Sequence, residues 1–79
     1  MNGLIADDEP TVLETFVTFV QALRPDAKIT KVDGGEEAIQ ILRSGVVFDL
    51  VITDLDMPNA NGLAVIAIAR VRLPKAKIA

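Results

Sequence analysis

Acidic side chains gather at two places in this sequence, each directly after a short apolar run. Asp7 and Asp8 end the first of these runs, and Asp54, with Asp56 two residues on, ends another near the middle of the chain. Ionised carboxylates that lie close together can hold a hard cation such as Mg²⁺, and one of them can accept a phosphoryl group. The two acidic groups are therefore the candidate site.

A simpler interpretation of these acids remains open. Asp is common after strands because it favours turns, so Asp54 could merely start one. Asp8 or Glu9 could serve only to cap a helix that begins at Pro10, a residue well suited to the first helical turn.

Composition limits the chemistry that the chain can perform. With 79 residues, residues 1–79 form one domain, and there is no cysteine and no histidine. The net charge is −3 and only three residues are aromatic, which argues against a nucleic-acid surface. The longest apolar run, residues 63–69, is too short to cross a membrane, and no secretion signal is evident. We therefore expect a cytoplasmic protein with no membrane or nucleic-acid partner.

Hydrophobic periodicity predicts alternating strands and helices. The expected strands cover residues 3–6, 28–32 and 50–52, with another opening at 75–79; the expected helices cover about 10–23, a stretch following the turn at 33–37, and about 62–71. Strict alternation favours a parallel sheet with right-handed crossovers. Ligand sites in such folds lie at the carboxyl ends of the strands, where both acidic groups fall.

Details of the helices can also be predicted. Asp33 can cap the second helix and Gly45 can end it in a left-handed conformation. The third helix has no polar side chain over residues 63–69, so we expect it to be buried on every side. The first helix has one broad apolar face, made of Val12, Leu13, Phe16, Val17, Phe19, Val20 and Leu23.

Four motifs occur in an order and spacing that resemble a known family. They are LIADDEP at residues 4–10, DGGEEAI at 33–39, FDLVITDLDMP at 48–58 and NGL at 61–63. The chain resembles a bacterial response-regulator receiver domain, truncated after the third strand–helix unit. The resemblance implies an α/β, three-layer, flavodoxin-like fold with strand order 2-1-3 and a possible fourth-strand stub. It also implies a signalling module of two-component, phosphorelay type rather than an enzyme.

The resemblance implies a role for each acidic residue. Asp54 matches the phosphoacceptor, and Asp7 and Asp8 match the pair that helps to hold Mg²⁺. Asp56 matches the position whose backbone carbonyl completes the metal site. The implied partner is a sensor histidine kinase or a full-length receiver.

Other positions match or depart from the family pattern. Pro58 and Gly62 match residues that shape the loop. Family members are half as long again, and carry a Ser or Thr after the fourth strand and a Lys on the fifth. This sequence ends at Ala79, and Lys75 and Lys77 come too early to replace that lysine. We therefore expect a Mg²⁺ site that is impaired as a switch.

Half of the residues are hydrophobic, which is high for so small a chain. An open sheet edge and uncovered apolar helix surface favour a homodimer with a twofold axis. The alternative is an incomplete fragment that aggregates.

Two other functions remain open. One is an interaction module that dimerises or binds a partner without being phosphorylated. The other is a phosphatase, because the D-x-D spacing of Asp54 and Asp56 also resembles the nucleophile pair of haloacid-dehalogenase-type enzymes.

Overall fold

A computed structural model describes residues 1–57 and 61–79. The expected part of Pro58 in shaping the loop lies outside these residues. The described elements are β1 (Asn2–Ala6), α1 (Pro10–Leu23), β2 (Lys28–Val32), α2 (Gly35–Arg43), β3 (Leu50–Thr53), α3 (Gly62–Arg72) and β4 (Lys77–Ile78). The predicted alternation of strands and helices is confirmed.

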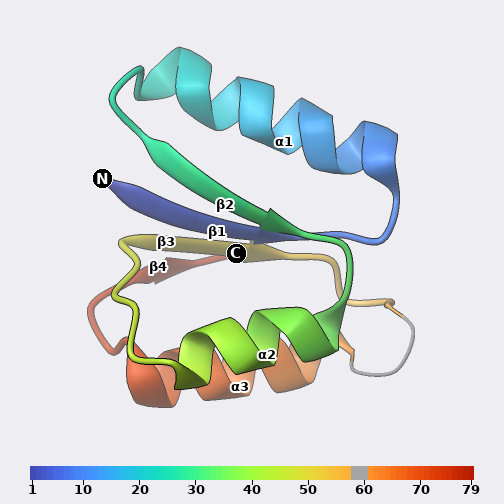
Figure 1. The fold of residues 1–79 in the computed structure, drawn as a ribbon, viewed down its shortest axis with the longest axis vertical. Helices are drawn as coiled ribbons and strands as arrows, with labels where there is room; N and C mark the ends of the chain where they lie inside the picture. Colours follow the sequence, from blue (N-terminus) through green and yellow to red (C-terminus); the bar gives the residue numbers. More distant parts are fainter. Residues whose placement is uncertain (58–60) are drawn as a thin grey trace.

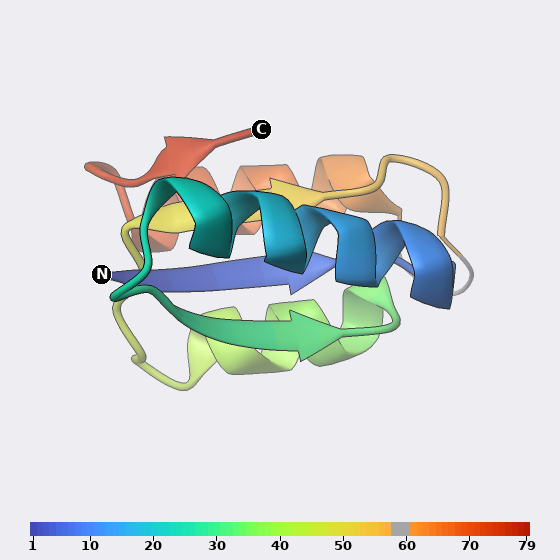
Figure 2. The ribbon, with the colours of Figure 1, turned by 90° about the horizontal axis from the view of Figure 1, so that it is seen from above.

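The described strands form one parallel sheet in the order β2-β1-β3-β4. Helix α1 lies on one face of the sheet, and α2 and α3 lie on the other (Figure 1). Figure 2, seen from above, shows α1 crossing over the strands while α2 and α3 lie beneath them. The predicted three-layer, truncated flavodoxin-like fold is confirmed, and β4 is the fourth-strand stub.

Alternation along β1 divides the core between the two faces of the sheet. Leu4 and Ala6 are buried against α2 and α3, whereas Ile5 is buried against α1. Because both faces of this strand are fully covered, it reads as a continuous apolar run in the sequence.

Helix α1 has the bounds that the sequence predicts. Glu9 caps it by accepting a hydrogen bond from the Thr11 N–H, so the capping interpretation holds for this acid. The sheet, however, buries only part of the expected apolar face. Leu13 and Val20 are buried, whereas Phe19 is 61% exposed.

Two expectations about the other helices are wrong. The residue that caps α2 is Gly34 rather than Asp33, and it makes no side-chain cap. Helix α3 is not buried on every side: Leu63 and Val71 are 64% and 80% exposed. The physical reason is that α3 lies in an outer layer, where the sheet and α2 contact only its inner side. Gly45 does take the predicted left-handed conformation, with φ of 94°.

Membrane crossing was also assessed on the described residues. None of their helices has both the length and the apolar character that a membrane span needs.

Candidate functional site

The structure brings three acidic side chains together at the carboxyl edge of the sheet. Asp7 and Asp8 follow β1, and Asp54 follows β3. These strands are direct neighbours, and Ala6 is level with Thr53, so the residues after them meet. One carboxylate oxygen from each acid lies within 4.8 Å of the other two.

Backbone hydrogen bonds hold two of these acids at the strand ends. The Asp7 N–H donates to the Val32 carbonyl at 3.1 Å, and the Asp54 N–H donates to the Ala6 carbonyl at 2.9 Å. Each acid is thereby held to the adjacent strand, β2 for Asp7 and β1 for Asp54. Their separation is therefore set by the sheet rather than by a free loop.

The three carboxylates differ in exposure and in hydrogen bonding. Asp7 is buried, and its Oδ1 accepts the Glu9 N–H at 2.9 Å. Asp8 is exposed, and Asp54 is half-buried. Oδ1 of Asp54 accepts the Asp56 N–H at 3.3 Å, which ties the start of the following loop to this side chain.

No ion pair to these three carboxylates occurs within residues 1–57 and 61–79. The amino group of Lys31, on β2, is instead paired with Glu14 of α1. Three like charges within 4.8 Å destabilise one another unless a cation is bound between them.

The donor set fits a hard divalent cation. Mg²⁺ takes oxygen ligands at about 2.0–2.1 Å, so two oxygens on opposite sides of the ion lie roughly 4 Å apart. The spacing in this cluster is close to that value and needs only small side-chain rotations. Nitrogen and sulfur ligands, which softer metals prefer, are absent from the cluster.

The other predicted site residues are placed as follows. Asp56 is exposed and adjoins Asp54, while the use of its carbonyl as a ligand stays a prediction. Lys77 is level with Leu50 at the start of β3, four residues before Asp54. As the sequence predicts, this lysine is therefore remote from the acidic edge.

Gly62 positions the site for a reason that sequence reasoning missed. A Cβ at this position would lie 1.9 Å from the carbonyl oxygen of Asp54 and 2.6 Å from the Cα of Leu55. The Gly62 N–H donates to the Leu55 carbonyl at 3.1 Å, and Asn61 caps α3 through the Ala64 N–H. The start of α3 is therefore pressed directly against the backbone of the candidate phosphoacceptor.

We expect Gly62→Ala to destabilise the fold and displace Asp54, because backbone atoms fill the space that a methyl group needs. Overpacking of this kind costs about 1–3 kcal/mol or more. In a domain of this size, each 1 kcal/mol corresponds to a decrease in Tm of about 4–8 °C. Thermal unfolding followed by circular dichroism measures the loss.

Gly34→Ala is the matched control for this substitution. Nothing lies within 4 Å of a Cβ at Gly34, and its φ of −160° is open to any residue. Equal Tm values for the two variants would contradict the packing role of Gly62.

Thr53 is a second positioning residue that the sequence did not reveal. Its side chain is buried, and its hydroxyl donates to the Asp54 carbonyl at 3.0 Å. A threonine at the end of a strand is so common that its spacing alone gave no signal.

Comparison with known proteins was made on this geometry. The family model "Response regulator receiver domain" matches residues 4–79. No curated protein sequence matches the chain. Solved structures match closely: a receiver protein from Sinorhizobium medicae is 32% identical, with a TM-score of 0.88, over 99% of this chain and 62% of its own.

Two other solved structures are informative. The receiver domain of the hybrid histidine kinase CckA is 26% identical, with a TM-score of 0.83, over 99% of this chain and 71% of its own. The response regulator TrrA from Thermotoga maritima, solved in complex with Mg²⁺ and BeF, is 36% identical, with a TM-score of 0.81, over 98% and 64%. TrrA has also been solved in complex with the histidine kinase ThkA.

This chain thus spans between 62% and 71% of the length of these relatives.

Proposed function

Because the chain belongs to the response regulator receiver domain family of two-component signalling, we propose that it binds Mg²⁺ and accepts a phosphoryl group on Asp54. The observation that carries this proposal is the meeting of the Asp7, Asp8 and Asp54 carboxylates within 4.8 Å at one edge of the sheet. An acidic pair beside a third carboxylate supplies both the ligands for a metal and a nucleophile.

Asp54 is the best placed of the three acids to act as the nucleophile. It is half-buried, whereas Asp7 is 5% exposed and its Oδ1 is engaged by the Glu9 N–H. A carboxylate oxygen of Asp54 forms the new O–P bond as the N–P bond of a phosphohistidine donor breaks. The imidazole that leaves keeps the electron pair of that bond and takes up a proton.

Asp7, Asp8 and Asp54 would hold the Mg²⁺ ion, with the backbone carbonyl of Asp56 as a further ligand. When bound, the ion supplies positive charge that offsets the negative charge of the carboxylates and of the incoming phosphoryl oxygens. The residues of this chain orient the nucleophile through the β3 backbone and through the packing of Gly62.

The proposed partners follow from the family and from one relative. TrrA was crystallised with the histidine kinase ThkA, which supports a sensor histidine kinase as the phosphodonor for this chain. A full-length receiver is the other candidate partner. We include homodimer formation in the proposal, because α1 and α3 expose large apolar side chains.

The proposal also states that residues 1–79 switch weakly by themselves. Among the described residues, Lys31 is already paired with Glu14, and Lys77 lies level with Leu50, away from the acidic edge. No described lysine is therefore free at this edge to contact the phosphoryl oxygens and move in response.

A metal titration tests the proposal directly. We expect Mg²⁺ to raise the Tm, because an ion present at 100 times its Kd stabilises the folded state by about 2.7 kcal/mol. Beryllofluoride, a phosphoryl mimic, should bind only when Mg²⁺ is present, which ¹⁹F NMR can follow. Thermal stability that does not respond to Mg²⁺, with no beryllofluoride signal, would contradict the proposal.

An interaction module that is not phosphorylated is the second candidate function. The observation that favours it is the exposed apolar surface of α1, which is independent of the acidic edge. Stable folding and partner binding without beryllofluoride uptake would support it. Nothing in the structure favours the phosphatase, whose acidic pair normally follows the first strand, whereas Asp54 follows β3.

A further inference from the structure

Helix α1 carries two apolar stripes, and its own sheet covers only one of them. Leu13, Val17 and Val20 pack toward the sheet. The second stripe, called here the α1 stripe, stays exposed. Its residues and their exposed fractions are Val12 (40%), Phe16 (37%), Phe19 (61%) and Leu23 (66%).

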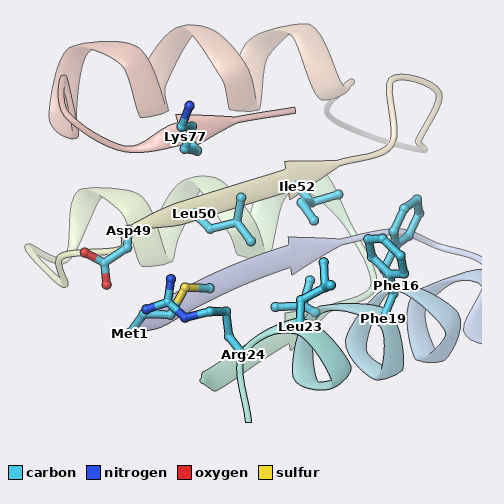
Figure 3. A pocket seen from close by; sticks show the side chains of 10 residues that line it. Met1, Phe16, Phe19, Leu23, Arg24, Asp49, Leu50, Ile52 and Lys77 are labelled. Carbon is cyan, nitrogen blue, oxygen red and sulfur yellow. The ribbon is translucent and has the colours of Figure 1, made fainter. Parts of the chain in front are cut away.

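The α1 stripe faces a groove that runs beside the helix. Leu50 and Ile52 of β3 lie along this groove, both half-buried, and its volume is about 720 Å³. Figure 3 shows Phe16, Phe19 and Leu23 projecting from α1 on the side where β3 presents these two residues. The exposed residues thus form one continuous apolar surface rather than isolated side chains.

The spacing of the α1 stripe identifies the element that fits against it. Its residues are separated by four, three and four positions, which is the alternation found where one helix packs along another. The stripe is also symmetric about a point midway between Phe16 and Phe19. An identical antiparallel helix would therefore place Val12 against the partner's Leu23, and Phe16 against the partner's Phe19.

We propose that two copies of this chain pair through their α1 stripes, antiparallel, about a twofold axis that passes between Phe16 and Phe19. This inference specifies the homodimer proposed above and does not depend on phosphoryl chemistry. Small side chains, Thr15 and Ala22, lie on α1 beside the stripe and let the second helix approach closely.

Charge selects the antiparallel orientation over the parallel one. The N-terminal end of α1 is acidic, with Asp8 and Glu9 exposed. The C-terminal end carries Arg24, and Asp26 beside it is offset by the N-terminal ammonium group at 3.5 Å. Lys77 lines the same end of the groove. An antiparallel pair brings the cationic end of one copy to the acidic end of the other, whereas a parallel pair opposes like charges.

Charge also argues against α3 as the element that fills the groove. Helix α3 exposes Leu63 and Val71, but Arg70 and Arg72 stand in its last turn. These arginines would meet the cations that line the groove, Arg24 and Lys77. A second α1 carries no cation within its stripe.

The first test is the mass in solution, measured by light scattering after size-exclusion chromatography. The unmodified chain of 8.5 kDa should run at twice its mass, and Phe19→Glu should halve that mass. Because Phe19 is 61% exposed, its replacement should leave the fold intact, which circular dichroism verifies. Thr18→Glu adds the same charge on an exposed position outside the stripe and should stay dimeric.

Cysteine cross-linking tests the orientation, since the chain has no cysteine of its own. A mixture of Val12→Cys and Leu23→Cys should form a mixed disulfide under mild oxidation, whereas Val12→Cys alone should not cross-link. A monomeric unmodified chain, a dimeric Phe19→Glu, or cross-linking of Val12→Cys alone would each overturn the inference. Beryllofluoride binding, measured separately, shows whether the proposed function fails independently of the dimer.

Discussion

Replacing Asp54 with asparagine should abolish uptake of beryllofluoride and of a phosphoryl group. An amide lacks the ionised oxygen that forms the bond to beryllium or phosphorus, and it removes one charge from the metal site. The loss should be complete rather than partial, because Asp7 is buried with its Oδ1 hydrogen-bonded and Asp8 is fixed on the other strand. Phosphoryl transfer from a histidine kinase or a small-molecule donor, followed by mass spectrometry, measures this directly.

Asp33→Asn is the matched control for this variant. Asp33 is exposed and follows β2, yet it does not belong to the carboxylate cluster. It loses the same charge and should still take up the mimic. Equal binding by Asp54→Asn and the unmodified chain would show that Asp54 is not the acceptor.

Replacing Asp8 with asparagine should change stability in opposite directions with and without metal. Without Mg²⁺ the variant should be more stable, because removing one of three like charges relieves repulsion of roughly 1 kcal/mol for an exposed pair. With Mg²⁺ it should lose most of the metal-dependent gain in Tm. Loss of a carboxylate ligand should weaken Mg²⁺ at least about tenfold, since even outer-shell changes cost 10–100-fold.

Isothermal calorimetry of Mg²⁺ binding, with thermal unfolding at zero and saturating metal, measures both effects. Asp56→Asn provides an informative comparison, because the proposed ligand there is the backbone carbonyl, which the substitution retains. Its loss of affinity should be clearly smaller than that of Asp8→Asn. If Asp8→Asn bound Mg²⁺ as tightly as the unmodified chain, Asp8 would not be a ligand.

Together these expectations describe a site whose geometry is set before any metal or phosphoryl group binds. The Asp54 backbone is fixed by the Ala6 carbonyl on one side and by Gly62 on the other. Preorganised charge of this kind is what makes a carboxylate cluster costly without a cation and effective with one.

Much of this architecture could be predicted from local sequence. Helix α1 was predicted with its observed bounds, because Pro10 at its start and Arg24-Pro25 at its end mark the limits of a strong apolar period. Strand β2 was predicted as a half-wet edge strand from its alternation, and it does lie at the edge of the sheet. The candidate acids were found because each follows an apolar run, a relation between immediate neighbours in the chain.

What the sequence could not decide depends on contacts between distant residues. It could not show that Gly62 is pressed against the Asp54 backbone, because residue spacing carries no information on how closely two segments approach. It gave α1 one broad apolar face, whereas the sheet covers only the part that includes Leu13 and Val20. Periodicity reports which side chains share a helix face, but only the packed fold decides how much of that face is buried and how much is left for a partner.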